Sequence, residues 1–266
     1  MIELNHIITK IDEFAPQSLA EEWDPVGLSF GDLHQKVQKI LVALDLDPIT
    51  LQEAIDHDVD LVVTHHPLIF KPIQTLNALD SKRRLYIKLI ERQIAVFSAH
   101  TNLDKAPAGM NEWLAQAIQL ENCKVLCPDI QKPEIGYGRY GKLPQSMTII
   151  ELIQYLKEKL PIEKVRYNEI QSGKRYSTIA ILGGSGADFT SDVLKTCADL
   201  YITGDISYHQ AQDMLRDGLS FIDVGHYVES IFIQKMSQLL ATWSDELDWN
   251  IEVIPTQKQK DVFKFL

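Results

Sequence analysis

Cysteine is scarce in this chain of 266 residues, which contains only Cys123, Cys127 and Cys197. Three residues separate the first two cysteines, and no second pair follows them. This spacing does not match the paired-cysteine motifs of structural zinc sites or of thiol redox centres, so we expect neither. Free thiols in a reducing compartment fit better, and we therefore expect a cytoplasmic protein.

Long hydrophobic runs are also missing, and basic residues are in the minority. No apolar segment has the length needed to span a bilayer, and residues 1–12 lack the pattern of a signal peptide. Lysine and arginine number 26 against 37 aspartates and glutamates, which gives a formal net charge of −11. This balance argues against a nucleic acid or an anionic membrane as the default partner and suits a soluble protein that attracts cations.

The familiar phosphate-binding and nucleophile motifs are incomplete. The glycine-rich stretch LGGSGAD at residues 182–188 lacks the Gly-Lys-Ser/Thr of a P-loop, and Phe189 stands where a dinucleotide fingerprint has its last glycine. Ser185 is not in a Gly-x-Ser-x-Gly elbow. We interpret Gly183–Gly186 as a tight turn, with anion binding by its amides as the alternative.

What the chain does contain is an alternation of apolar strands with helical segments. The strands are expected at residues 39–45, 60–66, 94–99, 177–182, 199–203, 219–223 and 249–254. The helices are expected at residues 2–14, 48–56, 81–93, 110–120, 148–159 and 227–242. Strands that alternate with helices predict an α/β fold with a largely parallel sheet.

The chain also indicates two lobes. Prolines and glycines punctuate the sequence from about residue 128, so we place a boundary there and expect lobes at 1–127 and 128–266. Residues 60–64 (DLVVT) resemble residues 199–203 (DLYIT), and the same offset of 139 relates residues 40–43 to 179–182. We therefore expect two related α/β lobes whose strand ends lie near one cleft.

The first candidate for chemistry is the doublet His65-His66. It follows the apolar run of residues 60–64, and Pro67 should end that strand. The carboxyl ends of strands are where open α/β sheets place their ligands. Adjacent side chains of an extended chain point in opposite directions. Either each histidine takes a different metal ion, or one is a ligand and the other is structural.

Two further strand ends offer the same kinds of side chain. His100 and Asp104 follow the strand at residues 94–99, and His226 and Glu229 follow the strand at residues 219–223. The i, i+3 spacing of His226 and Glu229 places both on one face of a helix. Alternatively, Asp104 is a loop carboxylate and the other two are an ordinary polar pair at a helix start. Imidazole and carboxylate ligands suit zinc, iron, nickel or manganese.

Three other places in the chain are weaker candidates. Trp23 and Asp24 belong either to a solvated loop or to a lip that faces a substrate. His209 lies on an expected helix beside Asp205, where a surface role is the default and a catalytic role is the alternative. The basic segment of residues 82–84 is interpreted as a solvated helix face.

Taken together, these motifs resemble the Nif-three-like family, many of whose members are called GTP cyclohydrolase 1 type 2 homologues. The resemblance covers almost the whole chain and has room for only a short central segment, as in the form without the large inserted domain. It rests on the segments EWDPVGL (22–28), THHPLIFKP (64–72), AHTNLD (99–104), GGSG (183–186), TGD (203–205) and VGHYVE (224–229).

The resemblance implies two related α/β lobes, a dinuclear metal centre in the cleft between them, and a ring-shaped homohexamer. Carried over by motif, His65 and Asp104 would bind one divalent ion. His66 and His226 would bind the other, and Glu229 would bridge the two.

The implied activity is metal-dependent hydrolysis, with a GTP cyclohydrolase-like opening of a purine ring by a metal-bridging hydroxide. His100 and His209 are the candidates for moving the proton. Lys71, Asp24 and residues 183–186 are candidates for substrate contact. The alternative is a non-catalytic metal-binding scaffold or regulatory protein that acts through partners.

Overall fold

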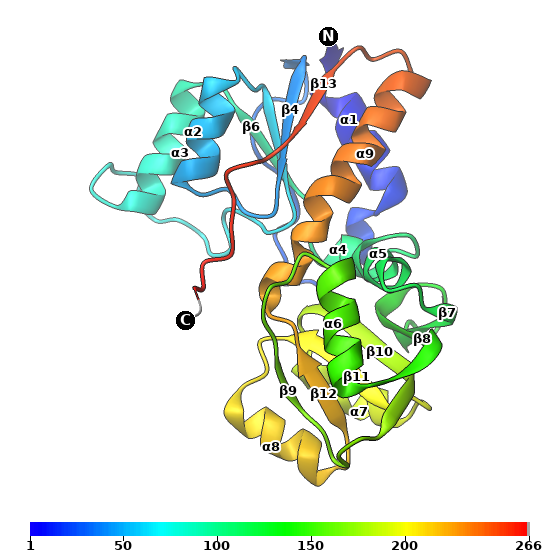
Figure 1. The fold of residues 1–266 in the computed structure, drawn as a ribbon. Helices are drawn as coiled ribbons and strands as arrows, with labels where there is room; N and C mark the ends of the chain where they lie inside the picture. The colour runs from blue at the N-terminus through cyan, green and yellow to red at the C-terminus, as the bar shows by residue number, and fades with distance from the viewer. Residues whose placement is uncertain (265–266) are drawn as a thin grey trace. The chain divides into compact units, whose positions relative to one another are not determined.

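The computed structural model describes residues 1–264, and these fall into two compact units (Figure 1). The first unit combines Met1–Leu103 with Phe232–Val262, and the second combines Asp104–Ile231 with residues 263–264. This division differs from the one expected at residues 127 and 128. Residues 104–127 contribute a helix and a strand that pack on the second sheet, and the chain returns to the first sheet at its end.

The first unit is built on a sheet of five strands. Their order is β13 (Glu252–Pro255), β4 (Lys39–Ala43), β5 (Leu61–Thr64), β6 (Ala95–Ser98) and β2 (Gly27–Phe30). The first four are parallel, and β2 is an antiparallel edge strand. Every residue of β5 and β6 is buried, as is typical of central strands covered on both faces. A small ladder pairs β1 (Ile2–Glu3) with β3 (Lys36–Val37).

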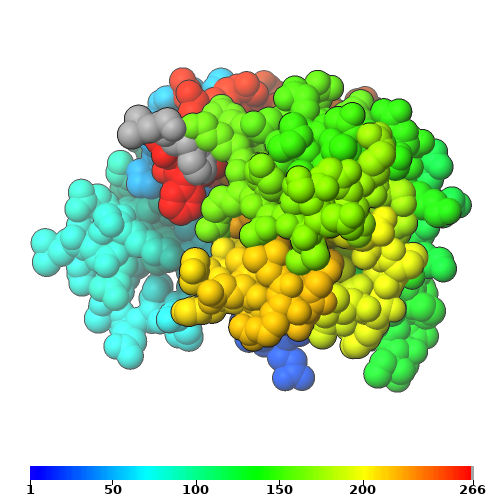
Figure 2. Space-filling view, turned by 60° about the horizontal axis from the view of Figure 1, so that its bottom comes forward, coloured from blue at the N-terminus to red at the C-terminus, as the bar shows by residue number. Residues whose placement is uncertain are grey.

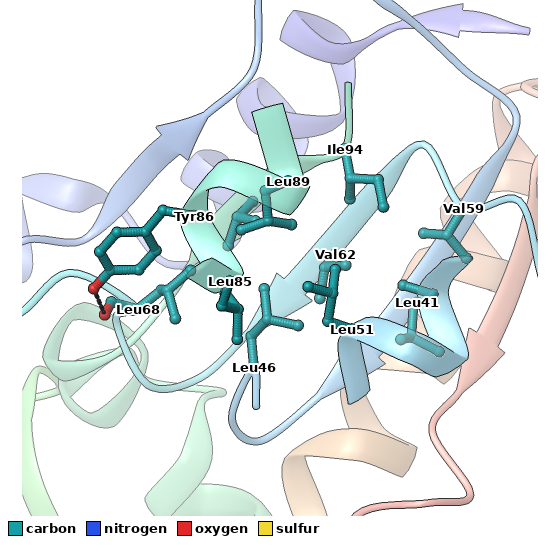
Figure 3. Packing of buried hydrophobic residues seen from close by; sticks show 12 residues of the cluster. Leu41, Leu46, Leu51, Val59, Val62, Leu68, Leu85, Tyr86, Leu89 and Ile94 are labelled. Carbon is teal, nitrogen blue, oxygen red and sulfur yellow. Dashed lines mark hydrogen bonds between the residues drawn. The ribbon is translucent and has the colours of Figure 1, made fainter. Parts of the chain in front are cut away.

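The helices of the first unit supply the apolar surfaces that cover this sheet. They are α1 (Leu4–Phe14), η1 (Gln17–Leu19), α2 (Pro48–Asp56), α3 (Ser81–Glu91) and α9 (Ile231–Glu246), with the short α4 (Thr101–Lys105) following β6. Leu51 of α2 and Leu85 and Leu89 of α3 pack with Leu41 and Val62 of the sheet in one buried cluster (Figure 3). The predicted cap of α2 is confirmed, because the Asp47 side chain accepts hydrogen bonds from the first amides of the helix.

The second unit is built on a sheet of six strands. Their order is β7 (Glu121–Pro128), β8 (Gly136–Thr148), β10 (Arg175–Ser185), β11 (Leu200–Gly204), β12 (Ser220–Asp223) and β9 (Arg166–Asn168). Strands β10, β11 and β12 are parallel to one another, and the outer strands are antiparallel. The sequence analysis did not predict β7, β8 or β9. Two glycines with positive φ, Gly136 and Gly138, sit inside β8 and make it read as a loop.

Helices in the second unit agree better with the sequence. They are α5 (Met110–Ala117), α6 (Ile149–Lys159), η2 (Ala187–Phe189), α7 (Thr190–Leu194), α8 (Tyr208–Arg216) and η3 (His226–Ser230), which runs into α9. Helix α6 begins with a capping box, in which Thr148 and Glu151 satisfy each other's backbone amides. A second buried cluster, which includes Tyr201, Met214 and Phe221, lies under these helices.

The internal repeat of the sequence has a structural counterpart. Strand β4 pairs in parallel with β5 through Ile40 and Leu61, and β10 pairs in parallel with β11 through Ile179 and Leu200. Adding 139 to the first pair of residue numbers gives the second pair. The same offset therefore relates the two strand pairs in sequence and in register, as expected for two related α/β lobes.

Within residues 1–264, no helix has both the length and the apolar character required to cross a membrane. The cyan segment around residues 67–91 lies at the surface in Figure 2, and residues 70–82 are all exposed. The three cysteines are free thiols, and burial raises the pKa of Cys123 and of Cys127.

Candidate metal centre

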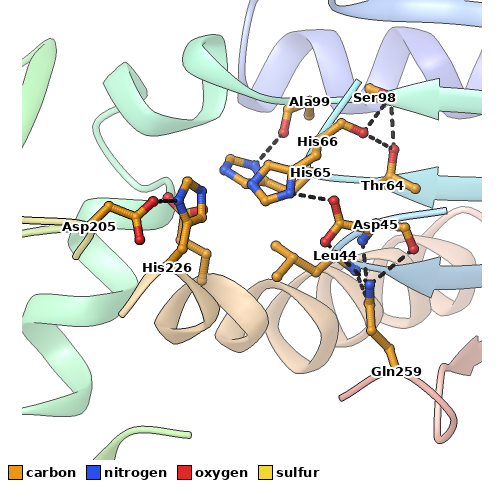
Figure 4. Close-up of polar contacts among 11 residues, drawn as sticks. Leu44, Asp45, Thr64, His65, His66, Ser98, Ala99, Asp205, His226 and Gln259 are labelled. Carbon is orange, nitrogen blue, oxygen red and sulfur yellow. Dashed lines mark hydrogen bonds and ion pairs between the residues drawn. The ribbon is translucent and has the colours of Figure 1, made fainter. Parts of the chain in front are cut away.

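The histidine doublet stands at the carboxyl end of β5, as predicted from its sequence. The strand ends at Thr64, whose hydroxyl donates to the His66 carbonyl over 2.9 Å and lies 2.8 Å from the Ser98 hydroxyl of β6. These bonds tie the turn after β5 to the neighbouring strand (Figure 4). The backbone that carries both imidazoles is therefore held by the sheet.

His65 is fully buried, and one ring nitrogen has a fixed role. Its Nδ1 lies 2.7 Å from the carbonyl oxygen of Ala99. Because a carbonyl can only accept, Nδ1 must carry the hydrogen, and the lone pair of the neutral ring is then on Nε2. This is the arrangement that a metal-binding imidazole usually has. Phe232 of α9 packs against the ring at a centroid distance of 5.5 Å.

His66 is oriented by a carboxylate in the same way. Its Nδ1 lies 2.7 Å from Oδ1 of Asp45, just beyond the end of β4. Gln259 holds this segment by donating to the Asp45 carbonyl and by accepting from the Leu44 amide at 2.8 Å (Figure 4). The lone pair of neutral His66 is therefore also on Nε2.

His100 completes a group of three histidines in the first unit. Its Nδ1 is 3.0 Å from both carboxylate oxygens of Asp24, whose side chain is fully buried. Burial by itself raises the pKa of Asp24, but hydrogen bonds from His100 and Thr101 outweigh it and hold this pKa below its ordinary value. His65, His66 and His100 each offer a ligand atom, and these atoms lie within 4.8 Å of one another, so the group could hold a metal ion.

In the second unit, Asp104 is fixed through a buried asparagine. The Asn111 side chain, 1% exposed, donates to the Asp104 carbonyl at 3.1 Å and accepts from the Gly183 amide at 3.1 Å. Asn111 thus connects α4 to the carboxyl end of β10. The sequence analysis did not identify Asn111.

His226 and Glu229 form the pair that their spacing predicted. Gly225, with a φ of +74°, lies between β12 and η3 as the N-cap residue of η3. His226 and Glu229 both lie in η3. His226 Nε2 is 3.1 Å from Oε2 of Glu229. His226 Nδ1 is 2.7 Å from Oδ2 of Asp205 (Figure 4). Asp205 has a φ of +53°, a left-handed conformation that aspartate tolerates better than most residues.

The glycine-rich end of β10 leaves room for the Glu229 carboxylate. Gly184 has a φ of +60°, and a Cβ atom there would lie 2.6 Å from Oε1 of Glu229. The Gly183 amide donates to Asn111 and the Gly186 amide donates to Thr203, so two of the four amides of Gly183–Gly186 are already used. Gly183, Gly184 and Ser185 nevertheless belong to strand β10, whose register shifts between Ile181 and Ser185, so the expected tight turn is instead the irregular end of a strand.

The remaining sequence candidates lie in different environments. His209 is exposed on α8, where its Nδ1 is 3.3 Å from Oε1 of Gln212. Within residues 1–264, His209 belongs to none of the groups that could hold a metal. Lys71 is exposed in the segment before α3, and Trp23 is 59% exposed beside Asp24.

Two of the carboxylates that orient histidines, Asp45 and Asp205, were not expected from the sequence. Asp45 lies two residues beyond β4 and Asp205 directly follows β11, each at the same edge of the sheet as the histidine that it contacts. The position of these carboxylates just beyond the ends of apolar strands is the sequence feature that could have identified them. A search for the partners of the candidate ligands, and not only for the ligands, would have found them.

The chemistry of these donors can be tested against the metal that the resemblance implies. Neutral imidazoles with a carboxylate or carbonyl on the other nitrogen, together with the buried Glu229 carboxylate, suit transition-metal ions better than magnesium or calcium. The residues present therefore fit a divalent transition metal. They do not choose among zinc, iron, nickel and manganese.

The fold and these groups define a class: a two-unit α/β protein with histidine and carboxylate groups that could bind metal. The Duf34/NIF3 (NGG1p interacting factor 3) family model matches residues 2–262. The chain therefore belongs to the Duf34/NIF3 family, which confirms the resemblance found in the sequence.

Relatives of known sequence agree with this assignment. A Streptococcus pneumoniae protein called GTP cyclohydrolase 1 type 2 homolog is 40% identical over 262 residues, which is 97% of this chain and 98% of that protein. A Clostridium perfringens protein of the same name is 36% identical over the full length of both. A Listeria innocua relative, 26% identical, aligns over 362 positions, so it carries residues that this shorter chain lacks.

Solved structures have the same fold. A Staphylococcus aureus protein of known crystal structure superposes with a TM-score of 0.93 at 29% identity, covering 100% of this chain and 99% of that one. A Bacillus cereus protein related to NIF3 gives a TM-score of 0.94 at 24% identity over 100% and 99% of the two chains. The predicted α/β fold is confirmed.

Proposed function

We propose that this protein is a metal-dependent hydrolase with two divalent transition-metal ions per subunit. The proposed ligands are His65, His66, Asp104, His226 and Glu229. In this proposal His65 and Asp104 bind one ion, His66 and His226 bind the other, and Glu229 bridges them.

One observation carries the proposal: the three histidines among the proposed ligands all have Nδ1 engaged by an acceptor. The acceptors are the Ala99 carbonyl, the Asp45 carboxylate and the Asp205 carboxylate, each at 2.7 Å. Neutral rings held in this way present Nε2 as the electron-pair donor. Nε2 of His226 faces the Glu229 carboxylate at 3.1 Å, where a divalent ion bound by both groups would take the place of a shared proton. Three histidines at ends of strands, each oriented by an acceptor, are more than core packing requires.

Bound divalent ions would lower the pKa of coordinated water towards neutrality and polarise a substrate oxygen. The residues of the chain would supply orientation and proton transfer. Asp24 holds Nδ1 of His100, so Nε2 of this ring can accept a proton, and the buried carboxylate would stabilise the imidazolium that results. His209 is the other candidate for this role. Because its side chain is exposed, His209 could transfer a proton only if the bound substrate itself contacts it.

For the substrate we propose a small molecule of the nucleotide type, with opening of a purine ring as the reaction. The support is the name shared by the relatives, GTP cyclohydrolase 1 type 2 homolog, together with the metal-binding donor set. The net charge of −11 makes a nucleic acid an unsuitable partner.

The test begins with metal content. The full chain is stripped with chelator, reconstituted separately with zinc, iron, nickel and manganese, and analysed for ions per chain and for turnover of GTP. We expect two ions per chain, with His66→Ala and Glu229→Ala each losing metal and reducing turnover at least 100-fold without unfolding the protein. His34→Ala, a change at an exposed histidine of the first unit, should do neither.

Two outcomes would contradict this proposal in different ways. Fewer than two ions per chain, with none lost in His226→Ala, would exclude the dinuclear centre. Full occupancy without turnover of nucleotides, phosphoesters or amides would favour the non-catalytic scaffold, for which the basic residues Lys82, Arg83 and Arg84 of α3 are a candidate contact surface.

We also propose a homohexamer, on the ground of the family alone. Light scattering of the metal-loaded protein would measure its mass against the 30.3 kDa of one chain. A particle of any size other than six chains would overturn this part of the proposal and leave the metal centre untouched.

A further inference from the structure

Two large aromatic side chains lie exposed and in contact in the first unit. Trp23 is 59% exposed and Phe70 is 46% exposed, and their ring centroids are 5.8 Å apart with the planes tilted by 42°. Isolated exposed apolar side chains are common on protein surfaces. Two exposed aromatic rings in contact form a contiguous apolar patch, which is a feature of ligand-binding and interaction sites. We call Trp23 and Phe70 the aromatic pair.

The aromatic pair continues into the histidine group. Its two rings lie 6.4 and 6.2 Å from the ring of His100, in edge-on arrangements. His100 in turn lies 5.1 Å from His65 and 5.6 Å from His66, measured between ring centroids. A row of contacting rings therefore leads from an exposed apolar surface to the candidate metal ligands. A ligand resting on the aromatic pair would have its other end at the histidines.

The exposure of Trp23 does not come from a loosely held loop. The neighbouring Asp24 accepts hydrogen bonds from the amide and the hydroxyl of Thr101 and from His100. The Asp24 amide donates to the Glu21 carbonyl and the Val26 amide donates to the Asp24 carbonyl, both at 2.9 Å. The turn is thus fixed on either side of Trp23 while more than half of this side chain stays exposed, which is the arrangement of a preformed binding surface.

We propose that the aromatic pair is the stacking surface for a planar heterocycle of the nucleobase type. This inference rests on the proposed function, because it names the ring-binding residues of the same site. Aromatic side chains bind bases through their faces whatever the base, and the edge-on His100 would lie at the rim of the stacked ring. Lys71, exposed and next to Phe70, provides a positive charge for an anionic substituent in an otherwise acidic protein.

The fluorescence of Trp23 gives a direct readout of stacking. Of the other three tryptophans, Trp113 and Trp243 are only 5% and 8% exposed, and Trp249 is half-buried and outside the aromatic pair. A ligand that stacks on the aromatic pair should therefore quench chiefly the emission of Trp23. The full chain, both metal-free and metal-loaded, is titrated with guanosine while the emission is recorded. We expect saturable quenching in both forms, and we expect Trp23→Phe to abolish most of the quenching.

Affinity for guanosine, measured by calorimetry, tests the role of each ring. Trp23→Ala and Phe70→Ala should each weaken binding roughly 10-fold or more, whereas Trp23→Phe and Phe70→Tyr should keep most of it. Ile49→Ala is the matched control, because Ile49 is also 59% exposed in the same unit and lies outside the aromatic pair. Ile49→Ala should bind guanosine as tightly as the unaltered chain.

The results of these experiments distinguish failure of the stacking surface from failure of the proposed hydrolase activity. Guanosine binding that requires the aromatic pair, in a protein without turnover, would support the stacking surface and contradict the hydrolase. GTP turnover with an unchanged KM in Trp23→Ala would do the reverse. If Trp23→Ala and Phe70→Ala alter the particle mass and leave guanosine affinity unchanged, the aromatic pair is a contact between chains and the inference is wrong.

Discussion

At the scale of single residues, the structure shows which carboxylates accept hydrogen bonds from the candidate metal-binding histidines. His66 and His226 could be recognised from sequence as candidate ligands, but only the folded chain shows that Asp45 and Asp205 hold their Nδ1 atoms. A carboxylate in this position fixes the tautomer and makes the opposite nitrogen more basic. Metal affinity should therefore depend on residues that never touch the ion.

This dependence gives a prediction for Asp45. In Asp45→Asn the side chain is the same size but has lost its charge, so it holds the proton on Nδ1 of His66 less firmly. We expect the protein to bind zinc about 10- to 100-fold more weakly, in the range found for such partner residues elsewhere. Competition with a chromogenic chelator measures this change directly.

Asp58→Asn is the matched control for the Asp45 variant. It removes the same charge from an exposed position of the first unit, and asparagine tolerates the positive φ of 52° found there. Equal zinc affinity in Asp45→Asn and Asp58→Asn would show that Asp45 does not act through His66.

At the scale of elements, the sequence predicted those whose signals are local. The helices α2 and α6 have caps within a few residues of their starts, and β5 is an unbroken apolar run closed by a proline. The edge strands of the second sheet lack such signals. An added Cβ would approach Leu126 within 3 Å at Gly138, and the Glu121 backbone within 3 Å at Gly141. Glycine is needed at these positions because β7 packs closely there, and β7 was not predicted from the sequence.

The candidate site follows the same rule. His65, His66 and the i, i+3 pair of His226 and Glu229 could be predicted because strand ends and helical spacing are local features. Asn111 could not, because its role comes from bonds to Asp104 and Gly183. These three residues come together only when α5 packs against β10.

The junction of β10 and β11 gives a prediction about pH. One oxygen of the Asp199 carboxylate accepts from the backbone amides of Ser177 and Thr178 at 3.1 and 3.0 Å. Burial raises the pKa of Asp199, but these bonds outweigh it and lower the pKa below its ordinary value. A lowered folded-state pKa stabilises the protein above about pH 4, the unfolded value, and this contribution is lost as the pH falls through the folded value.

We therefore expect Asp199→Asn to reduce the free energy of unfolding by about 1 kcal/mol at pH 7, a figure reduced for the partial exposure of the carboxylate. The difference from the unaltered chain should shrink below pH 4. Urea unfolding at pH 7, 5 and 3 measures it. Asp217→Asn, at an exposed carboxylate of the same unit, should show no such trend. A difference that grows on acidification would contradict the argument.

At the scale of the whole molecule, the chain crosses between the two units more than once. The first unit takes its last helix and strand from residues 232–262, after the second unit has been completed. A single division at residue 127 could not describe this, because the pairing of β13 with β4 joins residues more than 200 positions apart. Such long-range pairing leaves no local mark in the sequence.

The proposed ligands come from both units, and this gives a prediction about stability. A ligand that binds only the folded protein stabilises it by about 2.7 kcal/mol at a free concentration of 100 times its Kd. If His65 and His66 of the first unit share ions with Asp104 and His226 of the second, metal must stabilise both units together. Hydrogen exchange should then slow in the core strands of both sheets when zinc is added.

The alternative gives a different pattern. The group of His65, His66 and His100 lies entirely in the first unit and could hold one ion alone. Zinc would then protect β5 and β6 and leave β11 and β12 unchanged. Glu229→Ala distinguishes the two cases, because it should abolish zinc-dependent protection in both sheets if the ions are shared. Protection confined to the first sheet, and insensitive to Glu229→Ala, would show that the second unit contributes no ligand.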